Sequence, residues 1–382
     1  MTHICIIGSG LAGYLVATEI RKQLPEASIT MLTTTNGAYY SKPMLSTALA
    51  QGKTSSDLVM FSAAAMELRL KIKIITHVCV EKIDPEAKTI ITGKDLIDYD
   101  SCILAIGSDV IPLKLEQEIA AKIFTVNSLD DYSLFRDSLT DGMKIAVIGS
   151  GLVGVEFAHD LAAAGYSISV VGDAAYPLNR LIPAELGQVL QQTMQDKLKV
   201  SWHLNESVVA VEQGQDGVRI ECSSGAKINA DIVLSAIGIK ANLNLAKASG
   251  IKTGQGVLVD EMCRTNFSSI YALGDCAEVA GLNLHYVPPI RKCAAAIAAT
   301  LAGSPTPVNY PAMPVSVKSP VCPIAVCIPR TNDKLTCDVT GMVPDLVARF
   351  VDCDGALRGF ALSGAATKQK SELSQQIENW LG

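Results

Sequence analysis

Charged side chains are scarce in this chain, and so are aromatic residues and long apolar runs. Charged residues make up 18% of the 382 residues and aromatic residues 5%, whereas hydrophobic residues reach 49%. This composition excludes a disordered, highly charged chain, because such chains lack the side chains that build a core. No apolar stretch approaches the ~20 residues that a membrane-spanning helix requires, so we expect no membrane insertion. The net charge of −6 implies no basic surface for nucleic acid.

The sequence also lacks the signatures of an exported or metal-binding protein. An apolar strand pattern follows Met1 and Thr2 almost directly, without the basic and apolar regions of a signal peptide, so we expect a cytoplasmic location. Eleven cysteines are present, an odd number, and no two are spaced as C-x-x-C. A disulfide framework is therefore not expected. The five histidines share no ligand spacing with the cysteines, which predicts no metal site.

Two β-α-β units, about 140 residues apart, organise the chain. In each unit an apolar strand pattern ends at a glycine and is followed by a helix pattern and a second strand pattern. The strands are expected over 3–7 and 28–32 in the first unit, and over 144–148 and 167–171 in the second. This repetition predicts an α/β fold with two Rossmann-like parallel sheets. Prolines cluster after residue 304, which indicates a small α+β domain at the C-terminal end.

Further patterns fill in the three domains. Helices are expected over 288–302 and from Lys370 onward. Additional strands are expected over residues 71–76, 78–83, 88–92, 102–106, 208–212, 218–222, 226–229 and 232–237. We divide the chain into a first domain of residues 1–110 and 241–311, a second of residues 111–240, and a third of residues 312–382.

Each β-α-β unit carries a glycine fingerprint, G-x-G-x-x-G, between its first strand and its helix. The first glycine permits the tight turn, the second lets the backbone approach a pyrophosphate, and the third lets the helix pack on the strand. The helix N-terminus then offers free N–H groups to the anion. The two fingerprints are Gly8-Ser9-Gly10-Leu11-Ala12-Gly13 and Gly149-Ser150-Gly151-Leu152-Val153-Gly154. They predict two dinucleotides, one in each of the first two domains.

The residues after the second strand of each unit differ between the two fingerprints. Thr33 and Thr34 are neutral where a carboxylate for a ribose is usual, so a hydroxyl or the backbone would take its place. In the second unit Asp173 follows Gly172, and the nearest arginine is Arg180. A carboxylate there repels a 2′-phosphate, which favours NADH over NADPH.

A third feature lies downstream, where an apolar strand ends in Gly274-Asp275. A carboxylate in that place can lie beside a ribityl chain or a ribose. Two dinucleotides in one chain are typical of enzymes that bring a nicotinamide and a flavin together for hydride transfer. We therefore expect the first domain to bind FAD and the second to bind NAD.

In combination these motifs resemble the two-dinucleotide flavoprotein reductases, the group that includes glutathione reductase and the ferredoxin reductases. Five features occur in that group's order: the two fingerprints, Ala105-Ile106-Gly107, Ala236-Ile237-Gly238 and Gly274-Asp275. A closer resemblance, nearly full length, is to the bacterial rubredoxin reductases. It rests on Tyr40-Ser41-Lys42-Pro43-Met44-Leu45-Ser46 and on the segments GLVGVEFAHDL, YALGDCAEVAGLNL and MPVSVKSPVCPIAV.

The closer resemblance implies an enzyme that passes electrons from NADH through non-covalently bound FAD to rubredoxin, in alkane hydroxylation or an oxygen-reducing chain. It implies that Lys42 lies beside the flavin N5, is paired with Glu156, and with it forms the catalytic pair. It places further residues at FAD, namely Ser9, Gly10, Leu11, Ala12, Thr33, Thr34, Val80, Asp275, Val287 and Lys318. A helix starting near Pro289 would direct its positive end at the reduced flavin. The expected state is a monomer or a weak homodimer.

Residues 41–46 contain no cysteine, although disulfide reductases of this group carry a redox pair in that stretch. Cys322 and Cys327 are spaced C-x4-C, but residues five apart on a strand point to opposite faces. Electrons would therefore leave the flavin directly, one at a time, for a protein carrier. A reductase of a [2Fe–2S] ferredoxin and a redox-sensing flavoprotein similar to the apoptosis-inducing factor remain as alternatives. A degenerate fold without cofactor is disfavoured by the two intact fingerprints.

Overall fold

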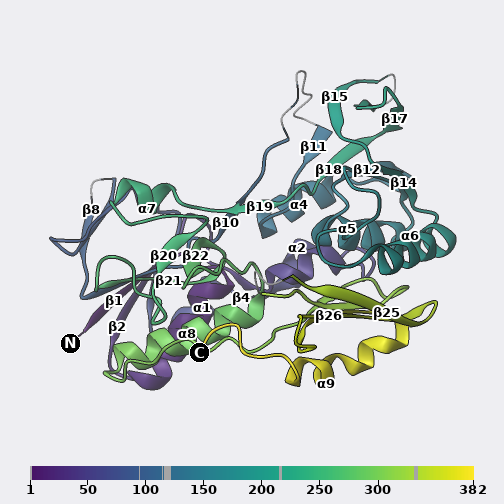
Figure 1. The fold of residues 1–382 in the computed structure, drawn as a ribbon. Coiled ribbons are helices and arrows are strands. Elements are labelled where there is room, and N and C mark those ends of the chain that lie inside the picture. Colours follow the sequence, from purple (N-terminus) through teal and green to yellow (C-terminus); the bar gives the residue numbers. More distant parts are fainter. Residues whose placement is uncertain (1, 94, 114, 116–121, 215–216, 331–333) are drawn as a thin grey trace.

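The computed structural model describes residues 2–93, 95–113, 115, 122–214, 217–330 and 334–382. Three five-stranded sheets form the framework of the described chain, two of them parallel and one antiparallel. In Figure 1 the first parallel sheet lies near the N-terminus, the second lies above and beyond it, and the antiparallel sheet lies below the second. The predicted α/β class, with two Rossmann-like sheets and a small C-terminal domain, is confirmed.

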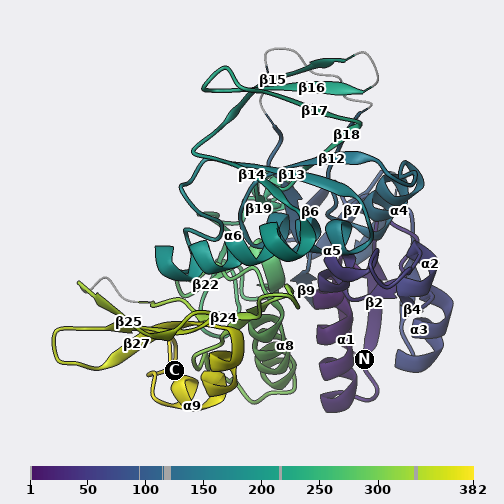
Figure 2. The same ribbon diagram turned by 90° about the vertical axis from the view of Figure 1, so that its right-hand side faces the viewer.

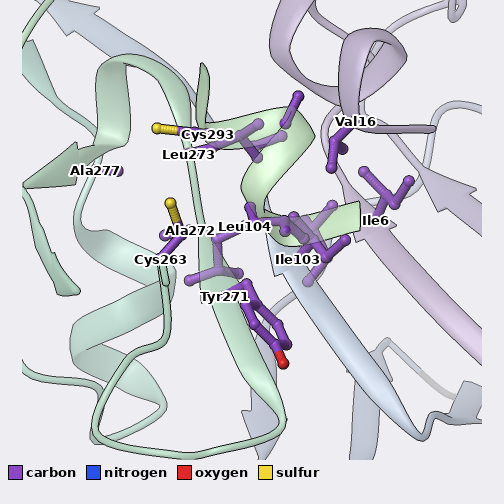
Figure 3. Packing of buried hydrophobic residues seen from close by; sticks show 14 of the residues in the cluster. Ile6, Val16, Ile103, Leu104, Cys263, Tyr271, Ala272, Leu273, Ala277 and Cys293 are labelled. Carbon is purple, nitrogen blue, oxygen red and sulfur yellow. The ribbon is translucent and has the colours of Figure 1, made fainter. Parts of the chain in front are cut away.

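The first parallel sheet has the strand order β21-β9-β1-β2-β5. Its strands are Ile270–Ala272, Ser101–Leu104, His3–Ile7, Ser28–Leu32 and Lys73–Ile75. Helices α1 (Leu11–Gln23), α3 (Ala63–Leu70) and α8 (Val287–Leu301) accompany it. Figure 3 shows how the core forms between α1 and the strands, where Val16 and Ile6 lie near Ile103 and Leu104. The chain returns to this sheet for β21 and α8 after building the second one.

The second parallel sheet repeats the design with the order β11-β18-β12-β13-β14. Its strands are Ile123–Phe124, Ile232–Ser235, Lys144–Ile148, Ser167–Gly172 and Ser201–Leu204. The accompanying helices are α4 (Leu129–Asp137), α5 (Leu152–Ala163) and α6 (Ala184–Leu198). Strands β12, β13 and β18 are almost wholly buried, as expected for a parallel sheet covered on both faces.

The chain passes between the two parallel sheets along a two-stranded antiparallel ribbon. Its strands are β10 (Ser108–Val110) and β19 (Ile239–Ala241), with Ser108 opposite Ala241. Smaller sheets extend both units. They consist of β3 (Tyr39–Tyr40) with β4 (Val59–Phe61), β6 (Lys82–Asp84) with β7 (Thr89–Thr92) and β8 (Asp95–Asp98), β15 (Val208–Gln213) with β16 (Val218–Cys222) and β17 (Lys227–Ala230), and β20 (Val257–Val259) with β22 (Ala277–Val279). Short helices are η1 (Lys42–Thr47), α2 (Ser55–Leu58), α7 (Asn244–Ala248) and η3 (Gly274–Cys276).

The antiparallel sheet has the order β23-β24-β27-β26-β25 and is followed by a short helical segment. Its elements are β23 (Val315–Val317), β24 (Ile324–Cys327), β25 (Thr336–Met342), β26 (Asp345–Val351), β27 (Leu357–Ser363), η4 (Gly364–Gln369) and α9 (Lys370–Gln375). Figure 2 shows this sheet beneath α6, with the β25–β26 hairpin reaching away from the molecule. No helix among the described residues has both the length and the apolar character to cross a membrane.

One hydrophobic cluster joins all three parts of the molecule. Leu45, Ala48 and Leu49, which follow the first β-α-β unit, pack in the same cluster as Val155 of α5 and Val317 of β23. The segment that begins at Lys42 is therefore buried mainly by residues from the second and third parts of the chain. This arrangement brings η1 next to the helix that follows the second fingerprint.

One predicted strand is largely wrong. The sequence pattern over 78–83 predicts a strand, but β6 begins only at Lys82. His77 adopts a left-handed conformation with φ +56°, and the Val78 N–H donates to the Thr33 carbonyl at 2.9 Å. The apolar side chains of this segment therefore cover the end of the first sheet instead of forming a ladder. The other strand patterns and the two predicted helices appear with bounds shifted by a few residues.

Candidate functional site

The first fingerprint forms a tight turn between β1 and α1 that only glycine permits. Gly8 has φ +111°, and a Cβ there would collide with the Ala105 carbonyl. A Cβ on Gly13 would collide with the Gly8 carbonyl, so the helix could not pack on the strand. Around Gly10, by contrast, no atom of the described residues lies within 4 Å of the Cβ position. The turn therefore has open space before the N-terminus of α1, where a pyrophosphate would fit.

The second fingerprint repeats this geometry between β12 and α5. A Cβ on Gly149 would collide with the Ala236 carbonyl, and one on Gly154 with the Gly149 carbonyl. The Cβ position of Gly151 is again open, with none of the described atoms within 4 Å. Asp173 follows β13 and is exposed, so its carboxylate is available to a ligand. The molecule thus contains two cradles of the same shape, one at each parallel sheet.

Three hydroxyl groups occupy the place where the first unit lacks a carboxylate. The Ser9 Oγ donates to the Thr33 Oγ1 at 2.8 Å, and the Thr35 Oγ1 lies 3.1 Å from that of Thr33. Thr34 points outward and is exposed. The hydrogen bond between Val78 and Thr33 brings the segment that contains Val80 to the same edge. Thr35 was not predicted from the sequence, although the run of three threonines could have indicated it.

Lys42 and Asp275 meet beside the first cradle. Lys42 opens η1, and its Nζ lies 3.8 Å from an oxygen of Asp275, which also accepts a hydrogen bond of 3.0 Å from the Ser108 Oγ. Gly274, just before Asp275, approaches Ala12 of the fingerprint helix. Burial lowers the pKa of Lys42, while the charge of Asp275 acts in the opposite direction. Sequence reasoning missed Ser108, because a serine in a strand carries no distinctive signal.

Glu156 has different partners from the predicted one. It is 3% exposed on α5; one carboxylate oxygen accepts the Lys318 backbone N–H at 3.0 Å, and the other accepts the Ser46 Oγ at 2.7 Å and the Lys318 ammonium. The predicted pairing of Lys42 with Glu156 is therefore wrong in this structure. Ser46 lies four residues beyond Lys42 in η1 and faces α5, whereas Lys42 extends toward Asp275. The sequence indicated neither Ser46 nor Lys318 as a partner of Glu156.

The N-terminus of α8 closes the first cradle from the C-terminal side. Val287 is the first helical residue, and Tyr286 before it provides no side-chain cap within the described structure. Nearby, the Nε2 atom of His285 is buried without a hydrogen-bond partner in the described part of the chain. In the second cradle the Oγ of Ser235, at the end of β18, is buried and equally unpaired among the described residues. Each of these two buried atoms therefore has a hydrogen-bonding capacity that the described residues leave unused.

These features together fit two dinucleotides. Open glycine turns and helix N-termini without a side-chain cap occur at both cradles, and Lys42, Asp275 and Ser108 add a polar group at the first. When bound, FAD supplies a centre that takes two electrons from a nicotinamide and releases them singly. The residues of this chain would bind and orient the two groups.

Thiol chemistry has no support at the first cradle. All eleven cysteines are free. Cys276 follows Asp275, but it is fully buried and burial raises the pKa of its thiol to about 12. Cys322 and Cys327 lie buried before and within β24. The arrangement therefore provides no thiolate relay beside Lys42.

Comparison with known proteins gives a consistent result. Residues 2–302 match the family described as pyridine nucleotide-disulphide oxidoreductase, and residues 307–377 match the rubredoxin binding C-terminal domain. The rubredoxin-NAD(+) reductase of Alcanivorax borkumensis is 38% identical, over 99% of this chain and 99% of that protein. The enzyme of the same name from Acinetobacter baylyi is 37% identical, over 99% and 98%. The predicted resemblance is thereby confirmed.

The fold is also shared with solved structures of low sequence identity. The structure described as the covalent putidaredoxin reductase–putidaredoxin complex superposes with a TM-score of 0.89 at 23% identity, covering 98% of this chain and 93% of the other.

Proposed function

The chain belongs to the pyridine nucleotide-disulphide oxidoreductase family, and we propose that it is an FAD-dependent enzyme that transfers electrons from NADH to rubredoxin. The observation that carries the proposal is the union of two dinucleotide cradles with a C-terminal region that matches the rubredoxin binding domain. The names of the two curated relatives support the same acceptor.

At the first cradle, the Gly8–Gly13 turn and the N-terminus of α1 would bind the FAD pyrophosphate. Ser9, Leu11 and Ala12 would contact that pyrophosphate as well. Thr33 and Thr34 would lie near the adenosine ribose, and the Val80 backbone near the adenine. Asp275 would bind the ribityl chain. Val287 and Lys318 would bound the isoalloxazine from the C-terminal side. Lys42, held by Asp275, would place a positive charge beside the flavin, where it favours the reduced form.

At the second cradle, the turn from Gly149 to Gly154 would bind the pyrophosphate of NADH. Asp173 would accept hydrogen bonds from the adenosine ribose and repel a 2′-phosphate. This repulsion is the basis for proposing NADH, and not NADPH, as the donor. Glu156, on the same helix, would hold the two cradles in a fixed relative position through its contacts with Ser46 and Lys318.

The remaining expectations complete the proposal. Residues 1–110 and 241–311 would form the FAD-binding domain and residues 111–240 the NAD-binding domain. Residues 312–382 would form the C-terminal domain, which would contact rubredoxin. The cytoplasmic location and the monomer or weak homodimer stay predictions. The same holds for a role in alkane hydroxylation or in an oxygen-reducing chain.

Stopped-flow spectroscopy tests the proposed function in two steps. The holoenzyme is first mixed with NADH, and loss of the flavin absorbance gives the rate of reduction. Reduced enzyme is then mixed with oxidised rubredoxin or with a [2Fe–2S] ferredoxin at equal low salt. Rapid oxidation by rubredoxin and slow oxidation by ferredoxin are expected. Fast reduction by NADH followed by negligible transfer to rubredoxin would overturn the assignment of the acceptor.

A further inference from the structure

Helix α5 carries three buried ionisable residues whose side-chain hydrogen bonds go to parts of the molecule outside the second parallel sheet. Glu156, His159 and Asp160 are 3%, 7% and 3% exposed. Their spacing of three and four residues places them on one side of the helix. None of the side-chain hydrogen bonds described for them is to the second parallel sheet: Glu156 reaches Ser46 and Lys318, and His159 accepts the Val321 N–H at 3.4 Å. The helix that begins at the second fingerprint therefore has a polar seam directed at the other two parts of the molecule.

Asp160 makes the most specific contact of this seam. One of its carboxylate oxygens accepts the Leu49 N–H at 2.9 Å, and the other accepts the Ala50 N–H at 3.1 Å. These two N–H groups lie just beyond the end of η1, the helix that Lys42 opens. A carboxylate can accept both bonds at once, which neither an amide nor a hydroxyl side chain does equally well.

The segment from Lys42 to Ala50 is consequently held at three points. Lys42 contacts Asp275 at the start, Ser46 donates to Glu156 in the middle, and Leu49 and Ala50 donate to Asp160 at the end. The two later points both belong to α5. The position of the Lys42 ammonium is therefore set by the helix of the NAD cradle as well as by its own ion pair.

Keeping a carboxylate at the position of Asp160 has an energetic cost. Burial raises the pKa of Asp160, and the two backbone N–H groups and the charge of Lys318 only oppose that effect. Leu45, Ala48 and Leu49 already pack in one apolar cluster with Val155 of α5, so what Asp160 adds is its two hydrogen bonds to the backbone and not apolar packing. A buried charge retained against this cost points to a function of the segment that it fixes.

We propose that Asp160 is a positioning residue for the flavin reaction: by fixing the end of the Lys42–Ala50 segment, it holds the Lys42 ammonium beside Asp275 and ties that position to the NADH-binding helix. The inference rests on the proposed function, in which FAD occupies the first cradle. It concerns the placement of Lys42 and does not depend on which protein accepts the electrons.

The test compares holoenzyme variants by flavin midpoint potential and by stopped-flow reduction with NADH. Asp160→Asn is expected to move the midpoint potential to more negative values and to slow reduction at saturating NADH about tenfold, with the Kd of NADH unchanged. Asp231→Asn is the matched control, because the Asp231 carboxylate also accepts a backbone N–H, that of Lys144, within the second sheet. The Asp231→Asn variant should keep the wild-type midpoint potential and the wild-type rate of flavin reduction. Asp160→Ser serves if the amide variant does not fold.

A double-mutant comparison then separates positioning from general stabilisation. If Asp160 acts through Lys42, then Asp160→Asn should have no further effect on potential or rate in a Lys42→Ala background. Equal effects in both backgrounds would overturn the proposal, and so would a lowered Tm with an unchanged potential. Failure of the proposed function is distinguishable, because wild-type enzyme would then fail to bind FAD, to be reduced by NADH or to reduce rubredoxin, whatever the variants do.

Discussion

Lys318 and Glu156 form an ion pair that joins the C-terminal sheet to the helix of the second fingerprint. The ammonium contacts the carboxylate directly, and the Lys318 backbone N–H donates to the same carboxylate at 3.0 Å. The lysine side chain is 33% exposed and the glutamate side chain 4%. The pair is therefore accessible from one side only, and the buried carboxylate depends on its partners for stability.

Lys318→Ala should destabilise the protein, because it leaves a buried carboxylate with only the Ser46 hydroxyl and one backbone N–H. The expected loss is about 1–3 kcal/mol, at the low end of the range for buried pairs because the lysine is partly solvated. Urea unfolding of the holoenzyme measures it. The double variant Lys318→Met, Glu156→Gln should recover most of the loss, and equal instability of the two variants would contradict this explanation.

Lys42, which is only partly buried, should make the rate of flavin reduction fall at alkaline pH. Its pKa is lowered from the ordinary 10.5 chiefly by burial, so the folded chain loses this proton at lower pH than the unfolded chain. Stability should therefore rise slightly with pH in that window, while the rate, which needs the charged form, should fall. The test is to measure the stopped-flow rate of flavin reduction by NADH from pH 7 upward in the wild type and in Lys42→Arg. A fall in rate that persists unchanged in the arginine variant would assign it to another group.

Gly10→Ala and Gly151→Ala form a matched pair that separates the two cradles. Both glycines have ordinary backbone angles and open space at the Cβ position among the described residues, so alanine should fold without strain. The added methyl would instead meet the pyrophosphate. Gly10→Ala should release FAD, measured as flavin content after purification. Gly151→Ala should keep FAD and raise the KM for NADH roughly tenfold, and the reverse outcome would exchange the two assignments.

Asp173 should control the choice of nicotinamide cofactor. Replacing its carboxylate with a neutral side chain removes the repulsion of a 2′-phosphate, and a neighbouring arginine would attract that group. The double variant Asp173→Ala, Ala174→Arg should lower kcat/KM for NADH about tenfold and raise it for NADPH by at least as much. Steady-state assays with both cofactors measure the ratio. An unaltered ratio would move the specificity away from this strand end.

The sequence was sufficient to predict the two cradles, because their glycines act through local geometry. Gly8 needs a positive φ and Gly13 a close helix–strand contact, and both requirements depend on residues within the fingerprint and the adjacent strands. The spacing of these glycines after a strand therefore determines the turn. Asp275 is similar, since it follows a strand of the same sheet.

Partners of the charged residues could not be predicted in the same way. Lys42 and Glu156 are 114 positions apart, and which of the available groups each one meets depends on how η1 lies between α5 and the C-terminal sheet. The resemblance to a family supplied the residues but gave the wrong pair. Ser46, Ser108 and Asp160 were missed for the same reason, since hydroxyls and carboxylates acquire these roles only through long-range packing.

The ribbon of β10 and β19 makes the second parallel sheet an insertion in the first unit, entered at Val110 and left at Ile239. Because the two strands pair directly, a short loop could join them and excise the inserted module without breaking the first sheet. Such an excision would nevertheless strip the cover from Leu45, Ala48, Leu49 and Leu58, which pack against the module. The inserted module can thus be removed without breaking the order of strands in the first sheet, but not without exposing part of the core. An ancestor without the insertion would have needed a different surface at the segment that follows Lys42.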